Sequence, residues 1–399
     1  MLQMSTLIPI LGSKKILRLM VIVGVFYQPF PAFSQSKYSC ITPLKTPIVS
    51  LIIPDYKNSF FWSYLVKIAI SSSKQLNINL RIHYIDAAFR SSFNYAQIID
   101  QILLKEERTK GKPDYVVSYF LGHTQKKVLD VLAKHQIKLF SYNSPIPANI
   151  TKIIGLPRER YKNWIGHIAP DEINVGYQLA DTLIQQHQAL AESVGKPVRL
   201  IGITGSRDSA VAQMRVQGLQ QRVNESPEVK LLQVLHTDWT YQQTKKRGAM
   251  LLNRFENIDV IWSASDLMAI AMIDNLKNSE QKSLNSITIG GIDWMKKTVP
   301  YLKNNEIQVS YGGHFFEPAW LLGMIYDHFN NLDFEKDPSV VVNYNLSPIF
   351  AENAKLLSID NVDNINFKAM SKCLTPATKH YQFNAMKLLE SQTKRKKND

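Results

Sequence analysis

Short apolar segments alternate with amphipathic segments along this chain, and the alternation runs in two successive series. The first apolar segment, residues 48–53, precedes a stretch in which Trp62, Leu65 and Ile68 recur at helical spacing. Further strands are predicted at 80–85, 115–118 and 137–142, and, in a second series that begins near Trp164, at 200–204, 231–236 and 260–263. Because these strands are apolar throughout, helices are expected to cover both of their faces. The pattern predicts an α/β chain with doubly wound parallel sheets.

The composition allows a sizeable core but leaves the binding partner open. With 399 residues, the chain is long enough for two to three domains. Its 45% hydrophobic residues exclude a disordered or low-complexity protein. The formal net charge of +14 favours an acidic partner, an anionic membrane surface or nucleic acid. Charge alone does not choose among these three.

The N-terminal segment has the pattern of a signal peptide. Lys14, Lys15 and Arg18 precede an apolar run at 19–26, and Ala32-Phe33-Ser34 supplies small residues where a signal peptidase cuts. We predict a signal peptide at 1–34 with cleavage after Ser34; a retained N-terminal anchor is the alternative. Export to the periplasm argues against nucleic acid as the partner.

Aromatic and polar residues follow the predicted strands. Parallel sheets bind ligands outside the carboxyl ends of their strands. Residues found there are Asp55, Tyr56, Asn58, Phe60, Phe61, Trp62, Tyr119, Phe120, Asn143, Ser144, Ser206, Asp208, Ser265, Asp266, Asp293 and Trp294. Flat aromatic faces combined with carboxylates and amides suit sugars and similar polyols. Core packing is the alternative role for any single aromatic residue.

Five motifs occur in the order seen in a known family. They are Tyr-Lys-Asn-Ser-Phe-Phe-Trp at 56–62, Gly-His-Ile-Ala-Pro-Asp-Glu-Ile-Asn-Val-Gly at 166–176, Arg-Val-Gln-Gly-Leu at 215–219, Ile-Trp-Ser-Ala-Ser-Asp-Leu-Met-Ala at 261–269 and Gly-Gly-Ile-Asp at 290–293. Each motif is weak alone. The ordered set, which spans roughly residues 46–345, resembles the type I periplasmic solute-binding proteins, the ribose-binding and autoinducer-binding group of two-lobed receptors.

The resemblance implies a domain organisation. In that family, two doubly wound parallel-sheet lobes are joined by a three-segment hinge, and a solute is trapped when the hinge closes. Carried onto this chain, lobe one comprises 35–168 plus 312–340 and lobe two comprises 169–311 plus 341–350. Residues 351–399 are left as a C-terminal extension, which is longer than simple sugar receptors need.

The resemblance also implies a ligand site between the lobes. The candidate ligand-binding residues are Asp55, Asn58, Phe60, Phe61, Tyr119, Asn143, Gln213, Arg215, Asp266, Asp293 and His314. Gly312 stands where relatives often place an amide or guanidinium, and Tyr119 where many have Asn, so a changed ligand is expected. Alternatives stay open: Arg215 can pair with a carboxylate of lobe two, and His314 can be a hinge residue bonded to backbone.

The expected function is capture of a small polar solute, a sugar or sugar-like molecule, for the permease of an ABC importer. The alternative is a ligand-sensing periplasmic subunit for a membrane sensor kinase or similar receptor, and a secreted enzyme is a third reading. The sequence contains no nucleophile elbow, zinc-protease helix or phosphate loop, so no catalytic residue, cofactor or metal is expected. A monomer that binds no nucleic acid is expected, and the solute itself is not identified.

Two further features concern the ends of the chain. Cys40 and Cys373 are too few for a disulfide scaffold or a four-thiolate zinc site, but in an oxidising compartment they can form one bridge. That bridge would tie the extension to the start of lobe one. The basic run 394–397 is interpreted as a solvated tail, with docking to anionic lipid or to a partner as the alternative.

Overall fold

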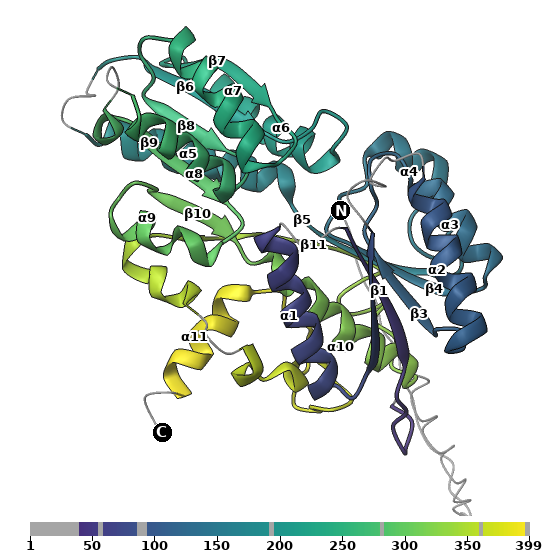
Figure 1. Cartoon of the computed structure of the whole chain (residues 1–399). Helices are drawn as coiled ribbons and strands as arrows, with labels where there is room; N and C mark the ends of the chain where they lie inside the picture. The colour runs from purple at the N-terminus through teal and green to yellow at the C-terminus, as the bar shows by residue number, and fades with distance from the viewer. Residues whose placement is uncertain are drawn as a thin grey trace, which may run out of the picture. The chain divides into compact units, whose positions relative to one another are not determined.

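The computed structural model describes residues 40–54, 59–85, 94–190, 195–279, 283–358 and 362–395. These residues contain two six-stranded sheets flanked by helices (Figure 1). The expected fold class, an α/β chain with two lobes, is confirmed. The predicted signal peptide at 1–34 lies outside the described residues, as do the candidate site residues Asp55 and Asn58.

Lobe one is built on a parallel sheet with the strand order β11-β5-β4-β3-β1-β2. Its strands are β1 (Ile48–Pro54), β2 (Asn79–Ile85), β3 (Tyr115–Ser118), β4 (Lys138–Tyr142), β5 (Trp164–Pro170) and β11 (Val341–Tyr344). Its helices are α1 (Phe60–Gln75), α2 (Tyr95–Thr109), α3 (Gln125–Lys134), α4 (Ala148–Ile154) and α10 (Glu317–Phe329), which is preceded by the 3-10 helix η5 (His314–Phe316). Every residue of β3 and β5 is buried, as expected for strands covered on both faces.

Lobe two is built on a sheet with the order β12-β10-β9-β8-β6-β7. Its strands are β6 (Val198–Thr204), β7 (Val229–His236), β8 (Val260–Ser263), β9 (Thr288–Ile292) and β10 (Val309–Gly312), all parallel, and β12 (Ser347–Ile349), which is antiparallel to β10. Its helices are α5 (Glu172–Gln188), α6 (Ala210–Asn224), α7 (Tyr241–Arg254), α8 (Asp266–Lys277), α9 (Val299–Lys303) and the 3-10 helices η3 (Leu284–Ser286) and η4 (Lys296–Thr298).

Capping side chains start the helices that follow the strands. Ser59 caps α1, Asp171 caps α5 and Ser265 caps α8, and each accepts a hydrogen bond from the backbone N–H three residues on. Ser209 and Thr240 cap α6 and α7 in the same way. The helices therefore begin at the carboxyl ends of the strands, where their remaining backbone N–H groups lie at the same edge of each sheet.

Three segments connect the lobes. The chain passes from β5 to α5 at 170–172, from β10 to η5 at 312–314 and from β11 to β12 at 344–347. The first and third segments are bonded to each other, because Asp171 N–H donates to the Tyr344 carbonyl at 2.8 Å and Asn174 Nδ2 donates to Asn345 Oδ1 at 3.0 Å. Gly313 in the second segment has a φ of +115°, a conformation that favours glycine.

The structure corrects the expected position of residues 341–350. The sequence analysis assigned this whole segment to lobe two. Instead, β11 pairs in parallel with β5 of lobe one, and only β12 joins lobe two. The apolar pattern of the segment indicates a strand, but a pattern of residues does not show which neighbour that strand pairs with.

The C-terminal extension packs on the two-lobed body. It contains the 3-10 helices η6 (Ala351–Leu357), η7 (Val362–Asn364) and η8 (Phe367–Met370) and the helix α11 (Ala385–Arg395). A disulfide joins Cys40 to Cys373, whose Cα atoms are 5.7 Å apart and which are separated by 333 positions in sequence. The bridge considered in the sequence analysis is therefore present, and it ties the extension to the start of lobe one.

Removal of this bridge by Cys40→Ser with Cys373→Ser is expected to lower the free energy of unfolding by about 3–5 kcal/mol, because the bridge closes a very long loop of the unfolded chain. Thermal unfolding without reductant measures the effect. Wild-type protein reduced before heating is the matched control and is expected to melt with the double variant. Equal melting temperatures for oxidised wild type and double variant would contradict the expectation.

Candidate functional site

A cavity of about 1220 Å³, called the cleft below, lies at the carboxyl ends of both sheets. Lobe one contributes Phe60, Phe61, Trp62, Tyr119 and Asn143, lobe two contributes Ser206, Asp208, Arg215, Asp238, Trp239, Tyr241, Ser265, Asp293 and Lys297, and the hinge contributes His314. The lining thus combines several aromatic rings with carboxylate, amide and hydroxyl groups. The cleft lies where doubly wound sheets generally bind ligands.

Most predicted site residues that the structure describes line this cleft. They are Phe60, Phe61, Tyr119, Asn143, Arg215, Asp293 and His314. Gln213 and Asp266 do not line it. For the residues that do, contact with a ligand remains a prediction.

Gln213 lies on the exposed side of α6. Its Nε2 donates to the Arg207 carbonyl at 2.6 Å, within the loop that precedes the helix. Arg215, two positions further, is buried and lines the cleft. Side chains two positions apart point about 200° apart around a helix, so Gln213 and Arg215 cannot both face the cleft.

Arg215 is held by a buried carboxylate of lobe two. Its Nε donates to Glu172 Oε2 at 2.5 Å, its Nη2 donates to Glu172 Oε1 at 3.1 Å, and its Nη1 donates to the Ala264 carbonyl at 2.6 Å. Burial opposes the charged guanidinium, but Glu172 outweighs it and raises the pKa of Arg215. This geometry is the alternative that the sequence analysis left open. Arg215 forms a charged wall of the cleft with most of its donors already used.

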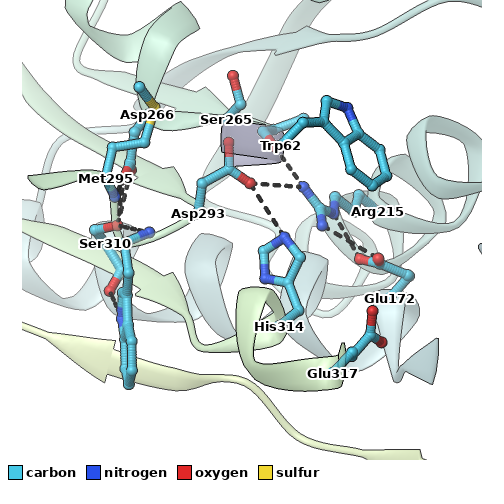
Figure 2. A network of polar contacts seen from close by, with 12 residues as sticks. Trp62, Glu172, Arg215, Ser265, Asp266, Asp293, Met295, Ser310, His314 and Glu317 are labelled. Atoms are coloured by element: carbon cyan, nitrogen blue, oxygen red, sulfur yellow. Dashed lines mark hydrogen bonds and ion pairs between the residues drawn. The ribbon is translucent and has the colours of Figure 1, made fainter. Parts of the chain in front are cut away.

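Asp293, His314 and Phe61 form a continuous contact across the hinge (in Figure 2, dashed lines join Asp293 to both Arg215 and His314). Asp293 Oδ1 is 3.4 Å from His314 Nε2 and 3.9 Å from Arg215 Nη1. The His314 ring stacks on Phe61, with centroids 4.6 Å apart and planes at 29°. Asp293 follows a strand of lobe two, Phe61 belongs to a helix of lobe one, and His314 follows the hinge glycine. These side chains therefore connect lobe one, the hinge and lobe two within the site.

The Asp266 side chain holds neighbouring segments of lobe two together. It is fully buried, and its carboxylate accepts hydrogen bonds from Ser310 Oγ at 2.8 and 2.9 Å and from the Met295 backbone N–H at 2.9 Å (Figure 2). Burial, reinforced by the nearby Asp293, raises the pKa of Asp266 well above its ordinary value. Asp266 fixes the loop after β9 against β10 instead of facing the cleft.

Trp294 packs against the hinge strand. The side chain is buried, its Nε1 donates to the Ser310 carbonyl at 2.9 Å, and a Cβ at Gly312 would lie 2.4 Å from its indole ring. Gly312 is therefore required to accept the ring. Trp294 does not line the cleft.

A second buried carboxylate lies where η5 leads into α10. Glu317 accepts a hydrogen bond from the Tyr344 hydroxyl at 2.9 Å. Burial raises the pKa of Glu317 well above its ordinary value, while hydrogen bonds from Tyr344 and Asn143 lower it in part. Asn143, which lines the cleft, has a φ of +65°. This group links the cleft to the third crossing segment through Tyr344.

The sequence analysis missed Trp239 and Tyr241, which follow β7, and Lys297, which follows β9. Trp239 lines the cleft with a φ of +68°, and a Cβ at Gly205 would lie 1.8 Å from its ring. Tyr241 also lines the cleft, and its hydroxyl donates to Asp274 Oδ2 at 2.6 Å. Lys297 Nζ lies 5.8 Å from the ring centroid of Phe60 and 5.9 Å from that of Tyr241. The strand-end rule applies to β7 as well and would have found Trp239.

Among the described residues, no group of three or more His, Cys, Asp or Glu side chains is arranged to hold a metal ion. No helix in the same part of the chain is long and apolar enough to cross a bilayer.

Comparison with known proteins shows the family of the chain. The model of the periplasmic binding protein domain matches residues 49–322, which is more than half of the chain. The galactofuranose-binding protein YtfQ of Escherichia coli is 23% identical over 146 residues, 36% of this chain and 44% of that protein. The chain spans about half the length of the curated relatives it matches.

Solved structures share the fold. A periplasmic sugar-binding protein from Pseudomonas fluorescens superposes with a TM-score of 0.73 at 22% identity, covering 86% of this chain and 99% of that one. An ABC transporter periplasmic solute binding protein from Actinobacillus succinogenes with bound D-allose gives a TM-score of 0.64 at 17% identity, covering 77% and 99%. At such low identity, the similarity concerns the fold alone.

The buried ion pair at the cleft generates a stability prediction. Arg215→Met and Glu172→Gln are each expected to lower the free energy of unfolding by about 3–5 kcal/mol, because each leaves one buried group without its partner. The combined variant is expected to lose less than the sum of the two. Denaturant unfolding measures these changes.

The exposed pair Lys126–Asp130 is the control, since both side chains are about half exposed or more. Lys126→Ala is expected to leave the unfolding midpoint nearly unchanged. An Arg215→Met variant as stable as this control would contradict the assigned role of the buried pair.

Proposed function

The chain belongs to the periplasmic binding protein family, and we propose that it is a receptor that captures a small polar solute, a sugar or sugar-like molecule, between its lobes. In this proposal, the loaded receptor delivers the solute to the membrane permease of an ABC importer. The observation that carries the proposal is the cleft, whose lining joins aromatic rings with polar side chains from both lobes.

The lining suits a sugar for chemical reasons. The C–H faces of a sugar ring pack on aromatic rings, and Phe61 and Trp239 supply such rings from opposite lobes. Sugar hydroxyls need hydrogen-bond partners when they leave water, and Asp293 and Asn143 are groups that can provide them. A purely apolar ligand would displace water from these polar groups without replacing the hydrogen bonds of that water, at a cost in binding free energy.

The relatives support this ligand class. Similar proteins are named for binding galactofuranose or were solved with bound D-allose. Both are sugars, but they differ in ring size and stereochemistry, so they favour the class without selecting one member.

Capture depends on contacts that exist only when the lobes are together. A sugar bound to Phe61 of lobe one alone gains only part of its contacts. When Asp293 and Trp239 of lobe two also reach it, the closed form binds more tightly than the open form. The solute then shifts the equilibrium toward closure by the difference between the two affinities.

Binding without chemical conversion is part of the proposal. The pKa of Asp266 is strongly raised, as the pKa of a catalytic general acid often is. No other feature of Asp266 indicates a catalytic role. Its carboxylate is buried and bonded to Ser310 and Met295, away from the cleft lining. Asp293 faces the cleft and can accept a hydrogen bond from a sugar hydroxyl, which keeps its proton.

Export completes the proposal. The basic and apolar pattern before Ser34 is that of a cleaved signal peptide, and the family of the chain acts in the periplasm. The Cys40–Cys373 disulfide supports an oxidising compartment for the mature protein.

A sugar screen by thermal shift tests the function. The panel contains D-allose, methyl β-D-galactofuranoside, L-arabinose, D-ribose, D-fucose and uncharged polyols. A ligand at 100 times its dissociation constant is expected to stabilise the native state by about 2.7 kcal/mol. Mass spectrometry of the recovered sugar is expected to show it unchanged. A hydrolysed or oxidised product would contradict a purely binding role.

Substitutions in the cleft test whether the sugar binds there. Phe61→Ala and Asp293→Ala are expected to weaken binding about tenfold or more in calorimetry, since each removes a contact from one lobe. Met250→Ala, at an exposed position of α7 outside the cleft lining, is the control and is expected to bind as wild type does. Full affinity in both cleft variants would move the site elsewhere.

A further inference from the structure

The C-terminal extension makes contacts with both lobes and with the hinge. Figure 1 shows it, in yellow, running from beneath α9 and β10 to beneath α1 and α10. The chain leaves lobe two through β12 and η6, and it then reaches lobe one through η7 and η8. We infer that the described parts of the extension, residues 351–358 and 362–395, form a fourth connection between the lobes, which restrains how far the cleft opens.

Polar contacts hold the extension on lobe one. The side chain of Gln75, the last residue of α1, donates to the carbonyls of Asp363 and Ile365 at 3.1 and 2.8 Å and accepts from the Phe367 N–H at 2.8 Å. Gln75 therefore binds three backbone groups of the extension. The Phe367 side chain is fully buried, so the extension is packed into lobe one at this contact.

A buried carboxylate of α10 gives a second attachment to lobe one. Asp327 is fully buried and accepts hydrogen bonds from the Ser371 hydroxyl at 2.5 Å, the Lys372 N–H at 2.7 Å, the Cys373 N–H at 3.1 Å and the Tyr381 hydroxyl at 2.6 Å. The disulfide from Cys373 to Cys40 adds a covalent attachment at the same place.

Close packing of backbones completes the attachment to lobe one. A Cβ at Gly323 of α10 would lie 2.3 Å from the Met370 carbonyl oxygen, so η8 lies directly against this helix. The rings of Trp320 and Phe383 meet edge to face with centroids 5.6 Å apart. Residues 362–383 thus behave as part of lobe one.

The other end of the extension belongs to lobe two. The 3-10 helix η6 packs on α9, and its Ala354 and Leu357 side chains are buried. Leu357 also lines a second cavity of about 390 Å³, together with Met295 and Trp294 of lobe two and with Phe61 and Tyr64 of lobe one. This cavity shares Phe61 and Met295 with the cleft, so η6 lies beside the site itself.

The last helix lies against the hinge. A Cβ at Gly313 would lie 2.6 Å from the Ala385 Cβ at the start of α11. α11 also contacts η6, and both Ala385 and Leu389 are buried. The backbone of Gly313 therefore lies close to the start of α11.

These attachments limit the separation of the lobes in two ways. The chain between Ser358, at the end of η6, and Val362, at the start of η7, has four peptide steps and spans at most about 14 Å. In addition, α11 follows a segment fixed to lobe one and packs on η6, which is fixed to lobe two. A hinge with only three crossing segments lacks both restraints.

Spin-label distance measurements on ligand-free protein test this inference independently of the proposed function. Ile153→Cys on α4 of lobe one and Met250→Cys on α7 of lobe two provide exposed labelling sites, and the two native cysteines are bonded to each other. The intact chain is expected to give one narrow distance distribution, because the extension holds the lobes within a small range.

Two changes release the restraint without removing any residue of the body. A flexible Gly-Ser segment of about ten residues inserted between Ser358 and Val362 lengthens the covalent link. Leu389→Asp places a charge at a buried position of α11 and releases that helix. Together they are expected to shift the distribution to longer distances and to broaden it.

Matched controls make the same kinds of change at positions that do not hold the lobes together. Lys387→Asp places the charge on the exposed side of α11, and the same Gly-Ser segment is appended after Asp399. Both controls are expected to keep the narrow distribution, and circular dichroism checks that every variant is folded. The inference is overturned if the released protein shows the same distribution as the intact chain, or if the controls shift as far as the released protein does.

Discussion

The chain crosses between its two sheets three times at one hinge, and this constraint brings the carboxyl ends of both sheets to a common cleft. Lobe two supplies the carboxylates of the cleft together with Trp239 and Tyr241, and lobe one adds further rings and the amide of Asn143. Phe61 starts from a helix of lobe one, Asp293 follows a strand of lobe two, and His314 lies just after the hinge glycine. The site therefore exists only because the topology places these three elements together.

Buried acids at helix starts hold this frame. Glu172 is the first residue of α5, Asp266 the first of α8 and Glu317 the first of α10. A helix N-terminus favours a negative charge, which offsets part of the cost of burying each carboxylate. Each one also bonds to a neighbour: Arg215, Ser310 and Tyr344, respectively. Because these acids serve the frame, Asp293 is left as the carboxylate that contacts both the hinge and the cleft.

The sequence predicted the strands and helices well because a strand that is buried on both faces consists of consecutive apolar residues. Pairing was less predictable: residues 341–344 have the apolar pattern of a strand, but their place beside β5 depends on the whole sheet. The strand-end rule found Phe61, Asn143 and Asp293. It cannot separate Gln213 from Arg215, since that difference is a matter of helix phase, nor show that Asp266 turns inward to Ser310.

Glycines explain a further part of what the sequence did not show. Gly205 and Gly312 each accept an indole ring, from Trp239 and Trp294, at distances that exclude any Cβ. These contacts decide that Trp239 faces the cleft and Trp294 does not. In the sequence, both tryptophans follow strands of lobe two in similar surroundings, so the distinction depends on partners that are distant along the chain.

The central claim is that two lobes close on a guest held between them, and small-angle X-ray scattering tests it most directly. When the protein is saturated with a sugar that calorimetry has shown to bind, the account predicts a smaller radius of gyration. A sugar that does not bind is expected to leave the radius of gyration unchanged. An identical scattering profile for the free and saturated protein would contradict the account.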